Sequence, residues 1–290
     1  MRRRSPVLIA LLLTSSLLLA ACGGSKHAAD ADGGGGGEDA TTTSAPDPWL
    51  TEVATATVPE VEVLLTKPAD ASGGGGSEPV EGQNASFATP AAPTAARLGD
   101  IPRQGLNSAG VRKTPDGYAF TNPTYFKNPL VFMVTEDDGD WLKVQVLARP
   151  NSQEGWIKRS DVTVSEIHTH MELNKATFHL KAFDGDNLIS ETDVVIGKDS
   201  TFTPVGRFFL AEKISHPPAG AYGPWILATS AYSEALDSFD GGLPQVAFHG
   251  TNNPSLIGTQ ASNGCVRMPN EVDEILNDKM PAGTPITITA

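Results

Sequence analysis

The chain has 290 residues, with 21 Lys or Arg against 34 Asp or Glu and a formal net charge of −13. This acidic balance excludes a nucleic-acid-binding protein, because the basic patch that neutralises phosphates is missing. After the first residues, apolar runs stay shorter than the roughly 18 residues that cross a bilayer, which excludes a protein with several membrane-spanning helices. The length is enough for one large domain or two of modest size.

The N-terminus has the pattern of an export signal. Arg2 to Arg4 precede an apolar run from Val7 to Ala21, as is typical of a secretory signal. The run ends in Leu19-Ala20-Ala21-Cys22, which resembles the bacterial lipobox. The resemblance implies that residues 1–21 are removed and that Cys22 carries lipid, which would anchor the exported protein to the outer face of the plasma membrane. A plain signal peptide cut nearby is the alternative.

Cysteine is scarce in this chain. Cys22 and Cys265 are its two cysteines, so lipid on Cys22 leaves no partner for a disulfide within the chain. A single remaining thiol in an exported protein is either an intermolecular partner or a reactive group. Cys265 is therefore the first candidate for a nucleophile.

Two stretches of low complexity follow the signal. Residues 22–48 are rich in Gly, Ala, Asp, Thr and Ser, and residues 68–100 contain a glycine run and a Pro/Ala tract. Neither stretch has enough large apolar residues to offset the entropy lost on ordering. We expect residues 22–48 to be a flexible linker and residues 68–100 to be an insert. Between them, residues 49–67 have a strand-like pattern and are expected to begin the next domain.

The next unit, residues 49–165, is predicted to consist of short strands with aromatic anchors. Alternation and apolar runs predict strands at Leu130–Thr135, Trp141–Val146, Gly155–Ile157 and Val162–Val164. Such a pattern favours a small barrel or sandwich. The strings GDWLKV and RPNSQEGWIKRSDVTV resemble the SH3-like accessory domain of actinobacterial wall enzymes. Trp141 and Trp156 are expected in its core.

Strand patterns continue through residues 166–290, with one helix. Asp184-Gly185-Asp186-Asn187 predicts a hairpin turn. The helical segment is expected to begin with Asn270 as its N-cap and to end at Pro281. Further strands are expected at Leu188–Ile196, Phe208–Leu210, Trp225–Ala228, Val246–Phe248 and Ile286–Ile288. The fold class is therefore mainly β: a small SH3-like β-barrel, then a β-sandwich or barrel with one helix beside its site.

The residues that carry chemistry concentrate around His249 and Cys265. His249 ends an apolar strand, and Cys265 follows 16 residues later, directly after Gly264. A thiol acts as a nucleophile when a base takes its proton and donors stabilise the oxyanion. A loop of this length brings the imidazole and the sulfur together, and pairing with imidazolium would lower the thiol pKa. On spacing alone, a catalytic Cys/His pair and a buried inert cysteine stay equally open.

The surrounding motifs resemble the signature of the L,D-transpeptidase (YkuD-like) family. His249-Gly250 matches its histidine–glycine pair, and Ser262-Asn263-Gly264-Cys265-Val266-Arg267 matches its Ser-x-Gly-Cys-[hydrophobic]-Arg string. Thr203–Phe208, Tyr222–Trp225 and Gly283–Ile286 also occur in the order of the family. The resemblance covers the chain from Ile167 to its C-terminus and implies a YkuD-like catalytic domain at residues 166–290.

The resemblance also implies a role for each motif residue. Cys265 is the nucleophile, His249 takes and returns the proton, and the Gly250 carbonyl orients the imidazole. Backbone N–H groups around Gly264 and Cys265 are the expected oxyanion donors. Substrate contacts are expected from Arg267, Ser262, Asn263, Tyr222 and Trp225. Pairing of Arg267 with a nearby acid is an equal alternative, and Tyr222 and Trp225 would look the same in sequence as buried aromatics. Many family members have histidine where this chain has Asn263, which cannot exchange protons near neutral pH. With His249 as the base, that position serves to shape the loop.

The activity implied is L,D-transpeptidation of peptidoglycan. The Cys265 thiolate attacks the third residue of a tetrapeptide stem, D-alanine leaves, and the thioester passes to the side-chain amine of another stem, giving a 3→3 cross-link. Expected partners are peptidoglycan stem peptides, carbapenem-type inhibitors and, through the N-terminal lipid, the cell membrane. The alternatives are an L,D-carboxypeptidase, an enzyme that attaches proteins to the wall, and a non-catalytic wall-anchoring lipoprotein.

No cofactor is implied by these motifs. His168-x-His170 has a spacing that fits zinc, but no third ligand stands nearby. We therefore expect no metal site. The sequence gives no indication of an oligomeric state.

Overall fold

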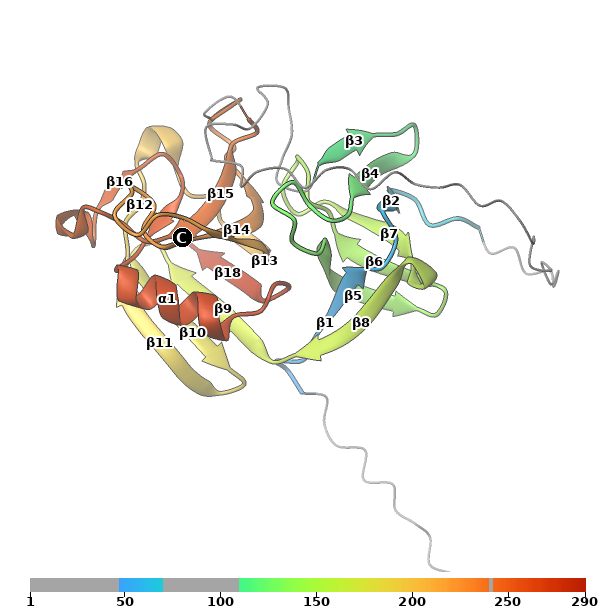
Figure 1. The fold of residues 1–290 in the computed structure, drawn as a ribbon, viewed down its shortest axis with the longest axis horizontal. Helices are drawn as coiled ribbons and strands as arrows, with labels where there is room; N and C mark the ends of the chain where they lie inside the picture. The colour runs from blue at the N-terminus through green and yellow to red at the C-terminus, as the bar shows by residue number, and fades with distance from the viewer. Residues whose placement is uncertain (1–46, 70–109, 240–241) are drawn as a thin grey trace, which may run out of the picture. The chain divides into compact units, whose positions relative to one another are not determined.

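The computed structural model describes residues 47–69, 110–239 and 242–290. The signal, Cys22, most of the 22–48 linker and most of the 68–100 insert lie outside these ranges. The described residues form mostly strands, with a single α-helix and a few short 3-10 helices (Figure 1), which confirms the mainly β prediction. Within these ranges, no helix is long and apolar enough to cross a membrane.

The first sheet takes its eight strands from residues 51–167, in the order β3-β4-β2-β7-β6-β5-β1-β8. These strands are β1 (Thr51–Ala56), β2 (Glu60–Leu64), β3 (Val111–Lys113), β4 (Gly117–Thr121), β5 (Val131–Asp138), β6 (Trp141–Gln145), β7 (Glu154–Lys158) and β8 (Val162–Ile167). The segment 49–67 thus supplies β1 and β2, which lie inside the sheet rather than at its edge. Strands β3 and β4 are not among the predicted strands. The SH3-like assignment of this unit stays a prediction.

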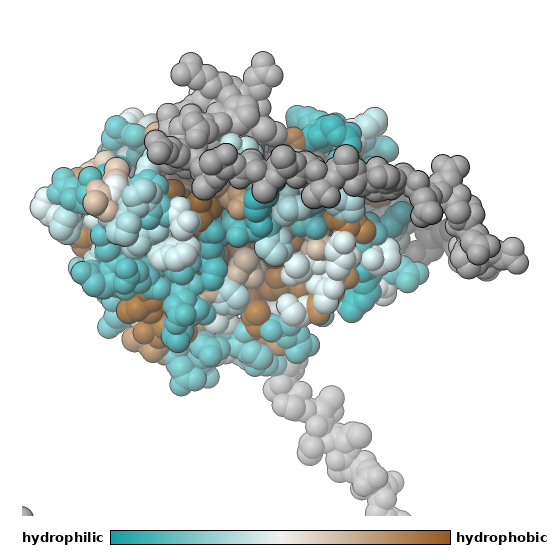
Figure 2. All heavy atoms as spheres, viewed as in Figure 1, coloured by the Kyte–Doolittle hydropathy of each residue, from teal (hydrophilic) through white to brown (hydrophobic). Residues whose placement is uncertain are grey.

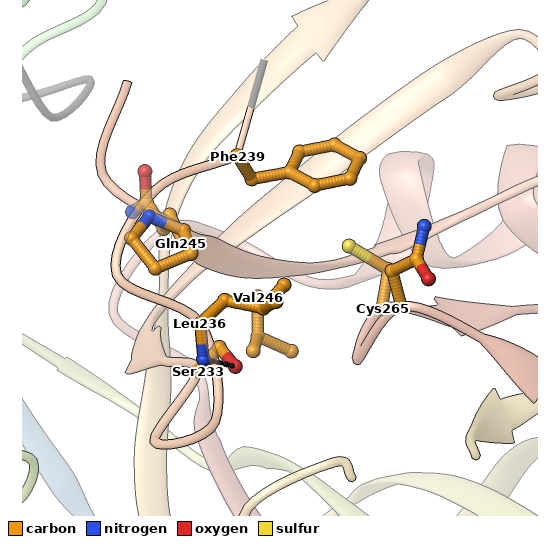
Figure 3. A pocket seen from close by; sticks show the side chains of 8 residues that line it. Ser233, Leu236, Phe239, Gln245, Val246 and Cys265 are labelled. Carbon is orange, nitrogen blue, oxygen red and sulfur yellow. Dashed lines mark hydrogen bonds between the residues drawn. The ribbon is translucent and has the colours of Figure 1, made fainter. Parts of the chain in front are cut away.

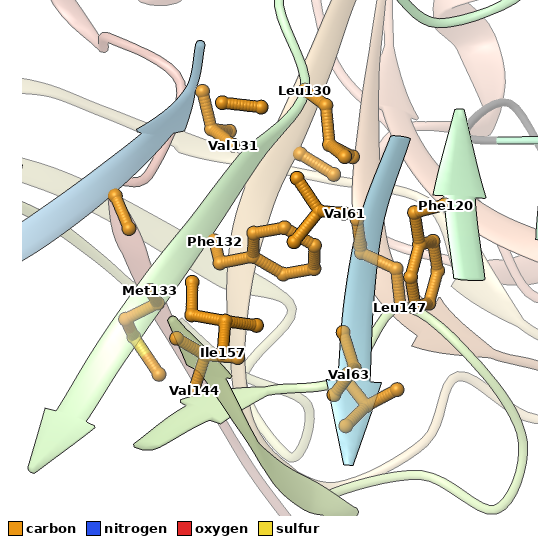
Figure 4. Close-up of a cluster of buried hydrophobic side chains, with 14 of the residues drawn as sticks. Val61, Val63, Phe120, Leu130, Val131, Phe132, Met133, Val144, Leu147 and Ile157 are labelled. Carbon is orange, nitrogen blue, oxygen red and sulfur yellow. The ribbon is translucent and has the colours of Figure 1, made fainter. Parts of the chain in front are cut away.

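The first core collects valine, leucine, isoleucine and phenylalanine side chains from β2, β4, β5, β6 and β7 (Figure 4). Trp141 and Trp156 do not belong to it, since both are half-buried. The prediction of two core tryptophans is wrong because Leu142 and Ile157 take the inward positions, and successive side chains on a strand point to opposite faces. The Trp156 ring lies instead 5.3 Å from the ammonium of Lys67, a cation–π contact near the surface.

The second sheet takes its eight strands from residues 169–289, in the order β11-β10-β9-β18-β13-β14-β15-β17. Its strands are β9 (Thr169–Asn174), β10 (His179–Asp184), β11 (Asn187–Asp193), β13 (Gly206–Ser215), β14 (Trp225–Tyr232), β15 (Gln245–His249), β17 (Val266–Arg267) and β18 (Pro285–Thr289). A two-stranded sheet joins β12 (Ile196–Gly197) to β16 (Gln260–Ser262). The last strand of the first sheet ends at Ile167 and the first strand of the second sheet begins at Thr169, while the domain boundary at residue 165 stays a prediction.

Strand β13 is buried on both faces. Phe208 and Leu210 belong to the second core, while Phe209 and Ala211 pack in the first. Because side chains alternate between the faces of a strand, one unbroken apolar run can serve two cores. This explains why residues 208–211 do not alternate with polar residues as the half-exposed strands do.

Helix α1 (Asn270–Lys279) packs Leu276 into the second core. Its N-cap position is occupied by Pro269, and no side chain caps the helix. The prediction of Asn270 as N-cap is therefore wrong: its side-chain oxygen accepts the backbone N–H of Thr251 instead, at 2.8 Å. Helix α1 is thus bonded directly to the turn that follows β15.

The surface on the viewed side is mostly hydrophilic. Apolar atoms gather over the region of α1 and the β10–β11 hairpin (Figure 2). Leu188 in β11 is 50% exposed and Ile275 in α1 is 40% exposed. The predicted turn at Asp184–Asn187 joins the two strands of this hairpin.

Candidate active site

The pairing of β15 with β17 sets the positions of His249 and Cys265. The two strands are parallel, with Phe248 opposite Val266 and His249 opposite Arg267. Phe248 and Val266 are fully buried in the second core, so His249 and Cys265 lie on the other face, because side chains alternate along each strand. Extending the register by one residue puts Cys265 opposite Ala247. Cys265 and His249 are therefore diagonal neighbours on one face, with Cα atoms about 8 Å apart for ordinary strand spacing.

The imidazole of His249 is held by the backbone that follows it. The ring is buried, and its Nδ1 lies 2.6 Å from the carbonyl oxygen of Gly250. Since a carbonyl only accepts, Nδ1 must carry the proton, and the neutral ring then presents a lone pair at Nε2. The Tyr222 ring and the imidazole pack in a T-shaped arrangement, with centroids 4.9 Å apart. The ring is thus fixed in the tautomer that a general base needs.

The surroundings of His249 keep it neutral. Burial lowers the pKa of its imidazole from 6.5 to about 4, and the nearby charges of Arg267 and His216 act in the same direction. The Gly250 and Tyr222 backbone groups oppose this shift by hydrogen bonding. At neutral pH the ring is therefore an unprotonated base.

Cys265 lies at a small pocket that is partly open to solvent. Figure 3 shows its sulfur pointing toward the side of this pocket that carries Phe239 and Val246. The pocket encloses about 20 Å³, which is room for little more than one water molecule. Burial raises the pKa of the thiol, although the Ala247 backbone N–H and the charge of Arg267 act against this. The prediction of a thiol pKa lowered by imidazolium is therefore wrong for this state, because the sulfur is desolvated and the imidazole beside it is neutral.

Hydroxyl groups hold the loop that carries Cys265. The Ser262 hydroxyl is fully buried and donates to the carbonyl of Cys265 at 2.6 Å. The Thr203 hydroxyl donates to the carbonyl of Gly264 at 2.8 Å and accepts the Gly197 N–H at 2.9 Å. The Thr201 hydroxyl donates to the carbonyl of Ser262. These bonds explain why Thr203 and Ser262 belong to the motif set: both shape the nucleophile loop.

The expected oxyanion donor Gly264 is already engaged. Its N–H donates to the Ser262 hydroxyl oxygen at 3.1 Å. The backbone here has a φ of +119°, a conformation that favours glycine. The loop thus uses that donor to hold its own turn, and the oxyanion role of the Gly264 N–H stays a prediction. Gly264 allows the backbone conformation of the turn that precedes Cys265.

The expected substrate-binding residues are spread around this face. Arg267 lies beside His249, and its Nε is buried without a hydrogen-bond partner among the described residues. Asn263 is exposed and lines the pocket at Cys265. Tyr222 covers the imidazole, whereas Trp225 packs against the second core. Arg267, Asn263 and Tyr222 are thus gathered around the Cys/His pair, while Trp225 supports it from the core side.

Two residues of α1 complete the site, and their role at the site is not predicted from the sequence. The carboxylate of Asp273 is fully buried and accepts the Trp225 N–H at 2.9 Å, and the Gly250 N–H also bonds to it. Asn270 accepts the N–H of Thr251. The sequence pattern that could have indicated Asp273 is an acidic residue in the first helical turn, which is usually explained by the helix dipole alone.

The paired histidines His168 and His170 do not form a metal centre. His170 is stacked between Trp49 and Phe183, with centroids 4.0 and 4.8 Å away. His168 faces Asp47 at 3.2 Å. Within residues 47–69, 110–239 and 242–290, no group of three or more His, Cys, Asp or Glu residues is placed to hold a metal ion. These side chains bind the segment that enters the first strand instead.

Comparison with known proteins agrees with this geometry. Residues 168–288 match the family model of the L,D-transpeptidase catalytic domain, YkuD. The YkuD protein of Bacillus licheniformis is 33% identical over 112 residues, which cover 38% of this chain and 59% of that protein. The YkuD protein of Bacillus subtilis is 34% identical over 95 residues, which cover 33% of this chain and 50% of that protein. The chain therefore spans half to three fifths of the length of these relatives.

A solved L,D-transpeptidase from Mycobacterium smegmatis is similar over 56% of this chain and 90% of its own, with 12% identity and a TM-score of 0.36. That likeness is too distant to support an argument about function. The family match stands on sequence, and it contains both His249 and Cys265. Residues 168–288 therefore match the YkuD L,D-transpeptidase catalytic domain.

Proposed function

We propose that this protein is an L,D-transpeptidase that forms 3→3 peptidoglycan cross-links through a thioester on Cys265. The observation that carries the proposal is the placement of Cys265 and His249 on one face of paired parallel strands, with Nδ1 of His249 bonded to the Gly250 carbonyl. In this proposal Nε2 of His249 is the base, and it shares one face of the paired strands with the thiol.

In the proposed reaction, the Cys265 sulfur attacks the carbonyl of the third residue of a donor stem while its proton passes to Nε2 of His249. The C–N bond to the terminal D-alanine then breaks, and Nε2–H protonates the departing amine. This leaves a thioester. The side-chain amine of an acceptor stem attacks the thioester, its proton passes to His249, and the C–S bond breaks to restore the thiol. Water in place of the amine would give the carboxypeptidase reaction.

The pKa shifts favour a concerted transfer. Because the thiol pKa is raised and the imidazole pKa is lowered to about 4, the resting pair is neutral. The thiolate then forms only as the substrate carbonyl is attacked, with His249 as general base. The Cys265 N–H is the proposed oxyanion donor, since the Gly264 N–H is bonded to Ser262.

Arg267 is the proposed anchor for a substrate carboxylate. Its guanidinium lies beside His249, and its buried Nε lacks a partner among the described residues. A carboxylate on the donor stem would satisfy this donor with a charge-assisted hydrogen bond. Tyr222, Asn263 and Ser262 are the proposed neighbours of the bound stem.

Carbapenem acylation tests the proposal. Intact mass of the protein exposed to imipenem should show one covalent adduct, and Cys265→Ala should abolish it. Cys22→Ala is the matched control, because it removes the other cysteine and should keep the adduct. Muropeptide analysis of the purified protein with tetrapeptide stems should then show 3→3 dimers. An adduct-free wild type would favour the non-catalytic anchoring alternative, and trimmed monomers alone would favour the carboxypeptidase.

We also propose that the protein is exported and anchored by lipid on Cys22 to the outer face of the plasma membrane. The support is the arginine start, the apolar run and the Leu-Ala-Ala-Cys string. Labelling of cells with an alkynyl fatty acid should mark the wild-type chain and leave Cys22→Ala unmarked. A wild-type chain that is secreted without label would instead support a plain signal peptide.

A further inference from the structure

We propose that Asp273 and Asn270, in the first turn of α1, are positioning residues that hold His249 as the Nε2 base by fixing the two peptide groups on either side of Gly250. The role in catalysis depends on the proposed function, whereas the effect on the imidazole does not. The helix that follows the nucleophile loop would thereby control the base.

The hydrogen bonds from α1 reach both peptide groups. The peptide that joins His249 to Gly250 presents its N–H to the carboxylate of Asp273. The next peptide, from Gly250 to Thr251, presents its N–H to Oδ1 of Asn270 at 2.8 Å. The carbonyl of that second peptide is the one that accepts Nδ1–H of His249 at 2.6 Å. Two side chains of one helical turn therefore fix the orientation of the carbonyl that selects the tautomer.

This turn is closely packed and leaves no room for a side chain at Gly250 or Gly223. A Cβ added at Gly250 would lie 2.3 Å from Oδ1 of Asn270 and 3.0 Å from Oδ2 of Asp273. A Cβ added at Gly223 would lie 2.5 Å from Cα of Gly250. Three segments thus meet without side chains between them: the β13–β14 loop, the turn after β15 and the start of α1.

Hydrogen bonding to one end of a peptide group strengthens the bond at the other end. Asn270 accepts the N–H of the same peptide whose carbonyl holds His249, so the two bonds polarise one another. The Asp273 carboxylate also accepts a hydrogen bond from the Trp225 N–H at 2.9 Å, which joins the loop that carries Tyr222 to the same carboxylate. Loss of either side chain should free the carbonyl and allow the proton of the neutral ring to move to Nε2, where it would block the base.

The test measures the tautomer directly. In the full chain labelled with ¹⁵N-histidine, His249→Gln identifies the His249 signals among the six histidines. At neutral pH the wild type should show the Nδ1–H form. Asp273→Leu and Asn270→Ala should shift the ring toward the Nε2–H form. Asp273→Asn keeps an acceptor oxygen and should keep the tautomer. Glu271→Gln removes an exposed acid from the same turn and should change nothing.

Imipenem acylation gives the second readout. Asp273→Leu and Asn270→Ala should lower the maximal acylation rate roughly 100-fold, as expected for a displaced catalytic group, with unchanged half-saturation. Asp273→Asn should stay within a few-fold of the wild type and so show rescue by the conservative variant.

Wild-type tautomer and rate in Asn270→Ala and Asp273→Leu would overturn the inference. If Asp273→Leu does not fold, Asn270→Ala alone decides it, because that variant removes one part-buried hydrogen bond and leaves the buried carboxylate in place. Absence of acylation in the wild type would refute the proposed function, while the tautomer comparison would still decide the role of Asp273 and Asn270.

Discussion

The two halves of the site are held by different chemistry. The nucleophile loop is fixed by neutral hydroxyls, from Ser262, Thr201 and Thr203, which bond to its backbone. The histidine turn is fixed by an amide and a carboxylate, from Asn270 and Asp273. Hydroxyls stay uncharged at any ordinary pH, whereas a carboxyl group gains or loses its charge as the pH changes. Changes of pH should therefore act on the base side of the site and leave the scaffold of the nucleophile loop intact.

The largest effect is expected from the base itself. His249→Gln keeps a polar side chain of similar reach but has no proton-accepting nitrogen near neutral pH. Loss of a general base typically costs 10²–10⁴-fold, so imipenem acylation should slow by about 1,000-fold. Stopped-flow fluorescence checks this, with His179→Gln as the matched control because that ring bonds to Asp193 in the β10–β11 hairpin. A variant that acylates as fast as the wild type would show that another group takes the proton.

The second effect concerns the charge of the resting thiol. Because the thiol pKa is raised, the thiolate fraction should grow about tenfold per pH unit through neutral pH. In Cys22→Ala, where Cys265 is the one cysteine, alkylation by iodoacetamide should rise roughly 100-fold from pH 7 to pH 9. A rate that is flat from pH 5 to pH 8 would instead indicate a thiolate–imidazolium pair and would reverse the assignment of a neutral resting state.

The difference between the two halves also separates what the sequence predicts from what it does not. Cys265, His249 and Gly250 were identified because a motif fixes residue types at short spacing. Asp273 acts across about 20 residues of chain, through backbone groups that carry no side-chain signature. Its acidic type and place in a first turn are equally explained by the helix dipole, so only the folded chain distinguishes the two.

The fold shows the same limit. Strand positions followed from alternation and apolar runs, as for β6 and β15. The outward placement of Trp141 was also present in that alternation, since Leu142 and Val144 already fill the inner face of β6. The hydrogen bond from the Gly264 N–H to Ser262 could not be predicted from the sequence, because motifs give residue types and spacing but no donor directions.

The third effect tests the nucleophile loop, which is held by uncharged hydroxyls. Thr203→Val keeps the shape of a fully buried side chain but removes two hydrogen bonds, to Gly197 and Gly264. An unsatisfied buried backbone group costs about 1–3 kcal/mol, so the free energy of unfolding should fall by about that amount. Acylation should slow about tenfold, by the same factor at pH 6 and pH 8. Urea unfolding and acylation rates check this, with the exposed Thr177→Val as control. A loss of acylation rate that differs between pH 6 and pH 8 would contradict the expectation that the scaffold of the nucleophile loop is insensitive to pH.

The smallest effect on acylation, a few-fold, is expected from Asp273→Asn. The stability of this variant relative to the wild type should, however, depend on pH. Burial raises the pKa of Asp273 from 3.8 to about 7, and the charge of Glu274 adds to this, while the Trp225 and Gly250 N–H groups act against it. A carboxyl with a raised folded-state pKa contributes stability that is complete below about pH 4 and is lost as the pH rises to about 7. For this shift the loss has an upper limit of about 4 kcal/mol.

His249 works in the opposite direction over the same pH range. Its pKa falls from 6.5 to about 4 on folding, so its contribution is present above pH 6.5 and is lost as the pH falls to about 4. The two groups therefore partly cancel in the wild type. Asp273→Asn removes one of them, so its free energy of unfolding should rise relative to the wild type between pH 4.5 and pH 7.5. Urea unfolding at both pH values measures this, with Glu271→Gln, an exposed acid in the same helical turn, as control. Parallel pH curves for Asp273→Asn and the wild type would show that Asp273 does not titrate in this range, and the base side of the site would then be as insensitive to pH as the nucleophile loop.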